Sequence, residues 1–349
     1  MDPNSTVLQS TFVYGVFKGM GDVLAAAPVV RSELDKGRLV TLLVYPQLTG
    51  FIRLLDFGPA SDRLTVEVLP KSRGSRGMWQ LFRQLANLSP TLVLISPHAP
   101  SPAASWKVPL LMWICRFLFW PQAILAGAKS EPLSALFDKR FQVNRELPLT
   151  AREWSLYRQA CPNIDGTPTD ARFKSSMYSA CGVEPEFDLI IHPGATAPNR
   201  KWPLEHYAEL MRLLPADFRI AIVGLPSDLE PLRQIIQTER DTVFISGTLE
   251  EAITSLGRAR VAMTMDSGSM FFANMLGVPT VALFGPSAPQ FVIPERSNIL
   301  PIYEQSLPCQ PCRDATCRIG TIECMTRIAP GVVARRLIRA IEASKNREL

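Results

Sequence analysis

The stretch Thr11–Val30, TFVYGVFKGMGDVLAAAPVV, joins a β-like run to a helix-like run through a glycine-bearing turn. Such a turn between a strand and a helix is typical of loops that hold a phosphate at the helix N-terminus. Here a carboxylate, Asp22, stands at that position and would repel the anion. The stretch therefore predicts the first strand–turn–helix unit of a parallel α/β fold, with a first loop that is poorly suited to a nucleotide diphosphate.

Short apolar runs alternate with helix-like runs in both halves of the chain. The runs predicted as strands are Thr11–Phe17, Leu39–Val44, Leu64–Leu69, Leu92–Ile95, Phe187–Ala195 with its exit loop, Phe218–Gly224, Val243–Gly247, Arg260–Met265 and Pro279–Gly285. Helices are predicted over Asp22–Leu34, Gly77–Ala86, Pro203–Pro215, Glu250–Ala259, Gly268–Gly277 and Gly331–Ser344, of which the last is amphipathic. This alternation predicts parallel sheets with helices on both faces.

The length of 349 residues favours two domains rather than one. The turn-rich segment Cys161–Asp170, CPNIDGTPTD, is typical of a linker. We expect a first domain over residues 1–165, a linker over 166–185 and a second domain over 186–349. Both domains are expected to be doubly wound and to face a central cleft, because ligands of such sheets bind beyond the carboxyl ends of the strands.

Composition limits the partners. The net charge of +5 fits an acidic partner such as a nucleotide diphosphate, a phosphorylated glycan or an anionic membrane surface. No long Lys/Arg run or aromatic-interleaved basic stripe is present, so nucleic acid is not expected. The N-terminus MDPNSTVLQS lacks the pattern of a secretory signal, which predicts a cytoplasmic location and reduced cysteines.

One apolar segment, Val108–Ala128, is about long enough to cross a bilayer. Pro109, Arg116 and Pro121 interrupt it, and charge near a bilayer centre is costly. We therefore expect a buried or interfacial helix pair, and a face that rests on a membrane is a further interpretation.

Two loops of the second half suit an anion. In His192–Pro203, HPGATAPNRKWP, Arg200 and Lys201 precede a helix, where cations are unfavourable unless an anion lies nearby. In the later loop, Asp266 and Ser267 follow a strand and can cap the next helix, next to a glycine that lets a ligand approach the backbone. A solvated charged pair and an ordinary N-cap are the plain alternatives for the two loops.

Three motifs in order, GMGDVLAAAPVV (residues 19–30), HPGATAPNRKWP (192–203) and DSGSMFFANMLGVPTVALFGPS (266–287), resemble those of glycosyltransferase family 9, the ADP-heptose:lipopolysaccharide heptosyltransferases. The cysteine-rich tail resembles that of the enzymes that add the second core heptose. The resemblance implies a GT-B fold, that is, two Rossmann-like domains with the acceptor in the first and the nucleotide-sugar in the second. It also implies an inverting transfer that needs no metal.

The resemblance further implies roles for individual residues. Asp22 matches the general base of the family, and Lys201 matches the lysine that stabilises the departing diphosphate. The residues implied in donor binding are Lys18, Thr196, Arg200, Gly224, Asp228, Asp266, Ser267 and Gly268. A helix N-cap is the alternative role for Asp22, and Glu230 competes with Asp228 as the ribose contact. Phe271 stands where the family usually carries a histidine.

Four cysteines near the C-terminus, Cys309, Cys312, Cys317 and Cys324, are spaced C-x2-C-x4-C-x6-C. In a chain predicted to be cytoplasmic, this clustering favours metal ligands over disulfides and predicts a structural tetrathiolate zinc or iron site. Related autotransporter heptosyltransferases carry iron held by four cysteines, so the resemblance supports the metal by analogy. Reduced or partly disulfide-linked thiols are the alternative, and no cofactor is expected for catalysis.

The sequence thus predicts a glycosyltransferase that moves heptose from ADP-heptose to a lipid-linked or core oligosaccharide acceptor in lipopolysaccharide biosynthesis. We expect it in the cytoplasm, in peripheral contact with the inner-membrane surface. A GT-B transferase that uses another nucleotide-sugar is one alternative. A catalytically silent family member that acts as a binding protein is the other.

Overall fold

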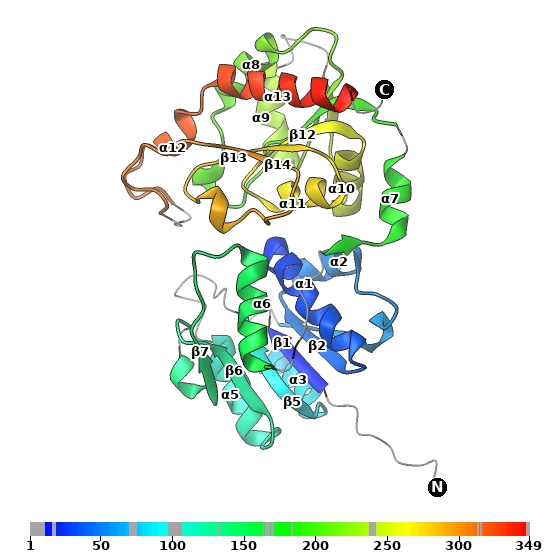
Figure 1. Ribbon diagram of the computed structural model, residues 1–349, viewed down its shortest axis with the longest axis vertical. Coiled ribbons are helices and arrows are strands. Elements are labelled where there is room, and N and C mark those ends of the chain that lie inside the picture. The colour runs from blue at the N-terminus through cyan, green and yellow to red at the C-terminus, as the bar shows by residue number, and fades with distance from the viewer. Residues whose placement is uncertain are drawn as a thin grey trace. The chain divides into compact units, whose positions relative to one another are not determined.

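A computed structural model describes residues 11–15, 19–69, 75–96, 107–131, 133–162, 164, 168, 171–182, 184–236, 242–312, 314 and 316–346. The chain divides into two compact units, Met1–Arg172 (unit 1) and Phe173–Leu349 (unit 2) (Figure 1). The division lies within the segment 166–185 that the sequence predicts as a linker. Each unit is a parallel α/β sandwich with its own sheet and its own core.

The sheet of unit 1 has six strands in the order β4-β2-β1-β5-β6-β7, and its neighbouring strands pair in parallel. The strands are β1 (Thr11–Gly15), β2 (Leu39–Val44), β4 (Leu64–Val68), β5 (Pro90–Ile95), β6 (Ile124–Ala128) and β7 (Lys139–Phe141). The main helices are α1 (Met20–Asp35), α3 (Ser75–Ala86), α5 (Lys107–Leu118) and α6 (Leu149–Ala160), with the short elements α2 (Thr49–Ile52) and β3 (Leu55–Asp56) between β2 and β4.

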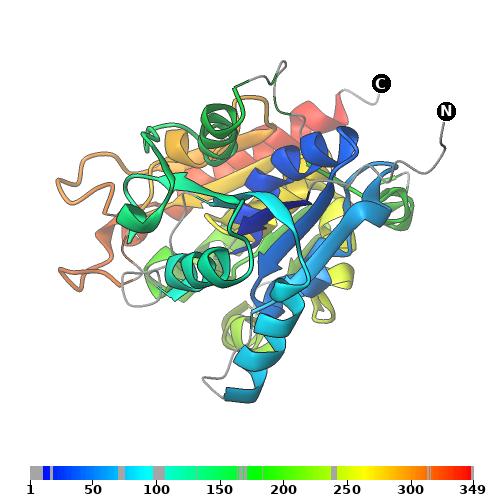
Figure 2. The ribbon, with the colours of Figure 1, turned by 90° about the horizontal axis from the view of Figure 1, so that it is seen from below.

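Helices cover both faces of this sheet. Helices α1 and α6 pack together on one face, while α3 and α5 lie on the other (Figures 1 and 2). Strand β1 is buried along its whole length, as expected for a strand covered on both sides. On the α3/α5 face, Val13, Leu43 and Val93 of the sheet pack with Met112 and Cys115 of α5.

The sheet of unit 2 has the order β11-β10-β9-β12-β13-β14, again with parallel neighbours. Its strands are β9 (Phe187–His192), β10 (Ile220–Val223), β11 (Val243–Ile245), β12 (Ala259–Met265), β13 (Thr280–Phe284) and β14 (Ile299–Tyr303). Its helices are α7 (Ser175–Cys181), α8 (Leu204–Leu213), α9 (Pro226–Ile236), α10 (Leu249–Gly257), α11 (Gly268–Met275), α12 (Glu323–Thr326) and α13 (Pro330–Lys345). Helix α8 packs against both α9 and α13, and α10 packs against both α7 and α11.

The C-terminal helix α13 confirms the amphipathic pattern of the sequence. Val333, Leu337 and Ile341 are fully buried, and Ile338 packs against the same core. This face closes one side of the unit 2 sheet, because α13 contacts both α8 and β12.

The apolar segment Val108–Ala128 corrects the prediction of a helix pair. Its first part is α5, but after Pro121 the chain forms strand β6, which lies between β5 and β7 in the sheet. The close packing of Phe137 against β6 requires glycine at position 127, since a Cβ there would lie 2.5 Å from Cε2 of Phe137. Within the described residues, no helix is both long and apolar enough to cross a membrane.

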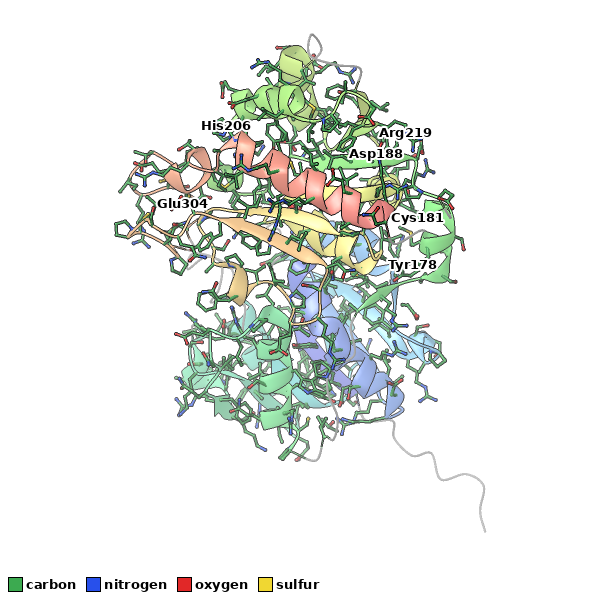
Figure 3. All side chains as sticks on the ribbon, turned by 45° about the horizontal axis from the view of Figure 1, so that its top comes forward. Tyr178, Cys181, Asp188, His206, Arg219 and Glu304 are labelled. Atoms are coloured by element: carbon green, nitrogen blue, oxygen red, sulfur yellow. The ribbon has the colours of Figure 1, made fainter. Side chains whose placement is uncertain are left out.

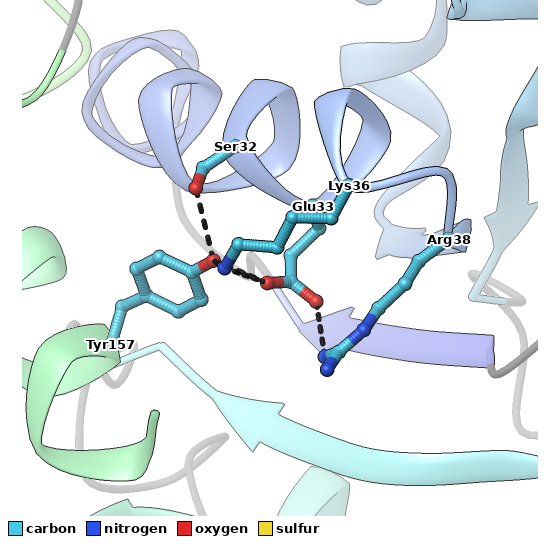
Figure 4. Close-up of polar contacts among 5 residues, drawn as sticks. All are labelled: Ser32, Glu33, Lys36, Arg38 and Tyr157. Atoms are coloured by element: carbon cyan, nitrogen blue, oxygen red, sulfur yellow. Dashed lines mark hydrogen bonds and ion pairs between the residues drawn. The ribbon is translucent and has the colours of Figure 1, made fainter. Parts of the chain in front are cut away.

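A buried charged cluster joins α1 to α6 (Figure 4). The Glu33 carboxylate is fully buried, pairs with Lys36 at 3.0 Å and Arg38 at 2.6 Å, and accepts a short hydrogen bond from the Tyr157 hydroxyl. Lys36 also donates to the Tyr157 oxygen at 2.7 Å, and Ser32 lies 3.1 Å from it. A buried carboxylate with this many partners is well compensated, so the cluster holds α1 in place against α6.

Candidate functional site

Asp22 lies in the first turn of α1, three residues after Gly19, and is 8% exposed. Its Oδ2 accepts a hydrogen bond from the Gly19 backbone N–H at 2.7 Å. The carboxylate therefore also helps to cap the helix, although from the third helical position rather than from the N-cap. Capping and proton acceptance are compatible, because the Gly19 N–H occupies only one of the several acceptor positions of a carboxylate. Lys18, predicted to assist in this loop, lies outside the described residues.

A second carboxyl group, Glu153, is buried near Asp22 and was not singled out by the sequence analysis. Glu153 comes from α6 and accepts hydrogen bonds from Ser96 Oγ at 2.6 Å and from the Tyr14 hydroxyl. All three residues are fully buried. Burial raises the pKa of Glu153 to about 8; the charges of Asp22 and Glu131 also raise it, while the two hydrogen bonds lower it.

Glu153 predicts a specific pH dependence of stability. The pKa of this carboxyl group is higher in the folded chain than its ordinary value of 4.5, so between these two values the folded chain binds more protons than the unfolded chain. The contribution of Glu153 to stability is therefore complete below pH 4.5 and is lost as the pH rises toward about 8. The free energy of unfolding should therefore fall with pH in this window, by at most about 1.4 kcal/mol per pH unit for one proton. Glu153→Gln, which cannot ionise, should flatten the slope in urea titrations at several pH values. An unchanged slope would contradict the assignment.

In unit 2, Lys201 and Asp228 form an ion pair. Lys201 follows the loop after β9, and Asp228 lies in the first turn of α9; Nζ and Oδ1 are 2.6 Å apart. The next residue, Trp202, is buried and donates from Nε1 to the Ile328 carbonyl at 3.0 Å, which anchors the lysine loop to the core. Gly194 is needed here, since a Cβ would lie 2.9 Å from Asp228 Oδ2.

Asp228 is both the expected ribose contact and the partner of Lys201. The sequence predicts it as a ribose contact, and the structure pairs it with Lys201 without testing that prediction. The side chain of Lys201 is 46% exposed, so its ammonium group remains accessible to a ligand from solvent. A diphosphate would then either displace the Asp228 carboxylate from the Lys201 ammonium group or bind this group together with the carboxylate.

Asp266 and Arg200 form a second pair at the end of β12. Arg200 Nη1 lies 3.3 Å from Asp266 Oδ2 and donates to the Asp266 carbonyl at 3.2 Å. The Ser287 hydroxyl makes a short hydrogen bond to the same carboxylate oxygen. Asp266 is almost fully buried, so Arg200 and Ser287 compensate its charge. Ser287 lies in the late motif, but its role could be recognised only from this contact.

The N-terminus of α11 follows directly. Ser267 is the N-cap residue but accepts no side-chain capping bond from the described chain; its Oγ lies 2.7 Å from Ser269 Oγ. Ser267 occupies the N-cap position, as the sequence suggests, but without a side-chain capping bond among the described residues, and Asp266 is instead bound by Arg200 and Ser287. The first backbone N–H groups, beginning at Gly268, thus keep the positive end of the helix available to an anion.

The other predicted donor residues lie at the same edge of the sheet. Thr196 is exposed in the loop after β9, and Gly224 directly follows β10 and donates to the Ile245 carbonyl at 3.1 Å. Phe271 packs against the apolar cluster of Met270 and Phe284, so it fills space where the family usually has a polar ring.

The opposite edge of the sheet serves stability. Asp188 at the start of β9 lies beside Arg219 (Figure 3) and accepts from its backbone N–H at 3.0 Å. Asp188 also pairs with Lys345 of α13 at 3.2 Å. Arg260 lies 3.8 Å from the same carboxylate. A cavity of about 370 Å³ at this edge, beside Cys181, is remote from the carboxyl ends of the strands and from the predicted donor residues.

The cysteine-rich loop packs beside the residues that are expected to bind the nucleotide-sugar donor. The Cys312 N–H donates to the Pro286 carbonyl at 3.0 Å, next to Ser287. Asn199, next to Arg200, donates to the Asp314 carbonyl at 2.8 Å. The loop therefore supports both segments that hold Asp266.

The four clustered cysteines are free thiols. Burial raises the pKa of Cys324 to about 11, with added repulsion from Cys312, Cys317 and Cys309. The Ile322 backbone N–H, followed by those of Ile319, Gly320 and Thr321, lowers the pKa of Cys317, because amide donors favour the thiolate. In the described part of the chain, however, no three His, Cys, Asp or Glu side chains are arranged to hold a metal ion. The donor set suits zinc or iron, whereas its arrangement here does not fit one.

Two parallel, doubly wound units, the second with basic side chains and an uncapped helix N-terminus at the carboxyl ends of its strands, define the GT-B architecture of glycosyltransferases. A family model described as glycosyltransferase family 9 (heptosyltransferase) matches residues 113–323. The chain belongs to this family.

Individual relatives agree with this assignment. Lipopolysaccharide heptosyltransferase 2 of Salmonella typhimurium is 34% identical over 131 residues, which cover 35% of this chain and 38% of the relative. The chain thus spans about two-fifths of the length of the first curated relatives that it matches. The structure of Escherichia coli ADP-heptose LPS heptosyltransferase II superimposes with a TM-score of 0.70 at 19% identity, over 96% of this chain and 99% of that one. The iron-containing dodecameric glycosyltransferase TibC of E. coli superimposes with a TM-score of 0.58 at 13% identity, over 96% and 77% of the two chains.

Proposed function

We propose that this protein is an inverting glycosyltransferase that moves heptose from ADP-heptose to a lipopolysaccharide core or related glycan acceptor. The observation that carries the proposal is the grouping of Lys201, Arg200 and the α11 N-terminus at one sheet edge of a family 9 chain. A diphosphate is an anion that these three features suit. The names of the relatives supply the heptose donor and the lipopolysaccharide-type acceptor.

In the proposed reaction, unit 1 handles the proton and unit 2 handles the leaving group. Asp22 accepts the proton of the acceptor hydroxyl while the oxygen of that hydroxyl forms a bond to the anomeric carbon of the donor sugar. The bond between that carbon and the diphosphate breaks, and ADP carries away the electron pair. Lys201, Arg200 and the α11 amides stabilise the charge that grows on the diphosphate. A single displacement inverts the anomeric configuration, and none of these steps requires a metal.

The test of this proposal is ADP release from the purified protein. With ADP-heptose and a heptose-deficient lipopolysaccharide acceptor, we expect ADP release that depends on the acceptor, together with an added heptose in the product's mass. Release of the nucleotide from another nucleotide-sugar, but not from ADP-heptose, would show that the other nucleotide-sugar is the donor. Nucleotide binding without turnover on any donor would identify a silent binding protein.

We also propose a cytoplasmic location and a structural zinc or iron at the four cysteines. The seven free thiols are compatible with a reducing compartment. Since Cys309, Cys312, Cys317 and Cys324 are not gathered around a common point here, the metal proposal requires the loop to close around the ion. A lipid-linked acceptor places the enzyme's substrate at the inner-membrane surface.

The metal proposal predicts a measurable content and a measurable consequence. Elemental analysis should find about one zinc or iron per chain, and Cys312→Ser should remove it. Because the Cys312 backbone bonds to Pro286 beside Ser287, loss of the metal should also weaken ADP binding. Cys115→Ser, which changes a buried cysteine of unit 1, is the control and should keep the metal. Absence of metal from the freshly purified wild type would refute the proposal.

A further inference from the structure

The charges of the chain are unevenly distributed around α3 and α5. The segment 68–130 contains none of the 32 Asp and Glu residues but seven Lys and Arg residues, namely Lys71, Arg73, Arg76, Arg83, Lys107, Arg116 and Lys129. Both helices come from this segment. The asymmetry is local, because the whole chain is only mildly basic at +5.

The outer surface of these two helices is aromatic. Trp79 of α3 is 68% exposed, Phe117 of α5 is 69% exposed, and Leu118 beside it is 58% exposed. Trp113 stacks on Phe117 with ring centroids 6.0 Å apart, one helical turn away. Exposed aromatic side chains grouped in this way are uncommon on a soluble surface and mark a contact site.

An aromatic contact links the two helices at the margin of the core, against which Phe82 also packs. Phe82 of α3 and Phe119 after α5 meet edge to face at 6.3 Å. The opposite side of α5 carries Met112 and Cys115, which are fully buried in unit 1. Core packing therefore uses one side of α5 and leaves Phe117 and Leu118, on the other side, largely exposed.

Arg83 contributes the positive charge next to the patch, because the other nearby arginine, Arg116, is paired with an acid. Arg83 is exposed on α3, one residue after Phe82. Arg116 lies beside Phe117 and pairs with Asp138 at 3.0 Å, which is the acid that α5 contacts through this arginine. An apolar partner surface with negative charge fits this arrangement, whereas a positively charged one does not.

We propose that the α3/α5 surface, defined by Trp79, Trp113, Phe117, Leu118 and Arg83, docks onto an anionic lipid bilayer. Aromatic rings favour the boundary between headgroups and acyl chains, and basic side chains add attraction to anionic headgroups. The patch involves none of the residues assigned to sugar transfer, so this inference goes beyond the proposed function and is tested without measuring turnover.

The experiment is co-sedimentation of the full-length protein with vesicles. Vesicles of phosphatidylcholine with ~30 mol % phosphatidylglycerol should bind the protein roughly tenfold more tightly than phosphatidylcholine alone, and added salt should weaken the binding. Phe117→Ser combined with Leu118→Ser should reduce binding roughly tenfold or more. Leu213→Ser, at a 45% exposed leucine of unit 2, is the matched control and should bind normally.

A charge pair keeps the proposal testable if the double variant fails to fold. Arg83→Glu should weaken binding to the anionic vesicles, while Arg336→Glu, on exposed α13 surface, should not. The proposal would be overturned by equal binding to both vesicle types, by an equal loss of binding in Arg83→Glu and Arg336→Glu, or by no vesicle binding at all. A dimer in sedimentation without lipid that Phe117→Ser dissociates would instead assign the patch to a second copy of the chain.

Discussion

Replacement of Asp22 by asparagine should lower the kcat of heptosyl transfer by ~10²–10⁴-fold, the typical contribution of a general base. Asparagine keeps the shape of the side chain and an oxygen that can accept the Gly19 N–H, so the start of α1 should persist. It cannot take a proton from the acceptor hydroxyl. The Kd for ADP should change little, because the proposed diphosphate contacts all come from unit 2.

One control variant and two further measurements on Asp22→Asn distinguish the base from the cap. Asp35→Asn, at the exposed far end of α1, should leave kcat, the Kd for ADP and the thermal midpoint unchanged. If Asp22→Asn retains kcat but lowers the thermal midpoint, the residue is a cap and not the base. If it retains its stability but loses ADP affinity, the proposed division of roles between the units is wrong.

Replacement of Lys201 by methionine should lower kcat by ~10²–10³-fold, as when a donor to a developing anion is removed. It should also weaken ADP binding. The ion pair with Asp228 adds to the effect, because the variant leaves that carboxylate without its partner at 2.6 Å and beside the expected diphosphate. An uncompensated carboxylate repels the phosphates as well as failing to bind them.

A double variant separates these two contributions. Lys201→Met combined with Asp228→Asn should recover part of the ADP affinity lost in Lys201→Met alone, but little of the kcat, since no cation is restored. Lys345→Met is the matched control, because Lys345 is 43% exposed and pairs with Asp188 at the opposite sheet edge. Additive losses in ADP affinity would show that Asp228 contributes directly to the nucleotide, as the sequence predicts, rather than through Lys201.

The elements with clear periodicity were predictable. Strand β2 matches its prediction, and α11 and α13 differ from theirs by one or two residues at their ends. Strand β6 was not predictable, because Ile124–Ala128 adjoins the apolar run of α5 and is too short to show a hydrophobic period of its own. Its strand conformation depends on pairing with β5 and on Phe137 packing against Gly127.

The candidate residues show the same limit. Local patterns identified Asp22, Arg200, Lys201 and Asp266, since each lies between a strand and the first turn of the next helix, where ligands bind. Their partners were not predictable. Glu153 lies 139 positions from Tyr14, and Ser287 lies 21 positions from Asp266. No local spacing relates residues that far apart.

Order along the chain was therefore enough to establish two parallel α/β units and the loops that present charged side chains, because hydrophobic period and turn chemistry are local properties. Which charges neutralise one another was decided only on folding. Parallel strands are joined by long crossovers, so residues that meet in the fold lie far apart in the sequence. Three features therefore depend on the tertiary structure: the pairing of Lys201 with Asp228, the burial of Glu153 with its two hydrogen-bond donors, and the exposed aromatic side of α5.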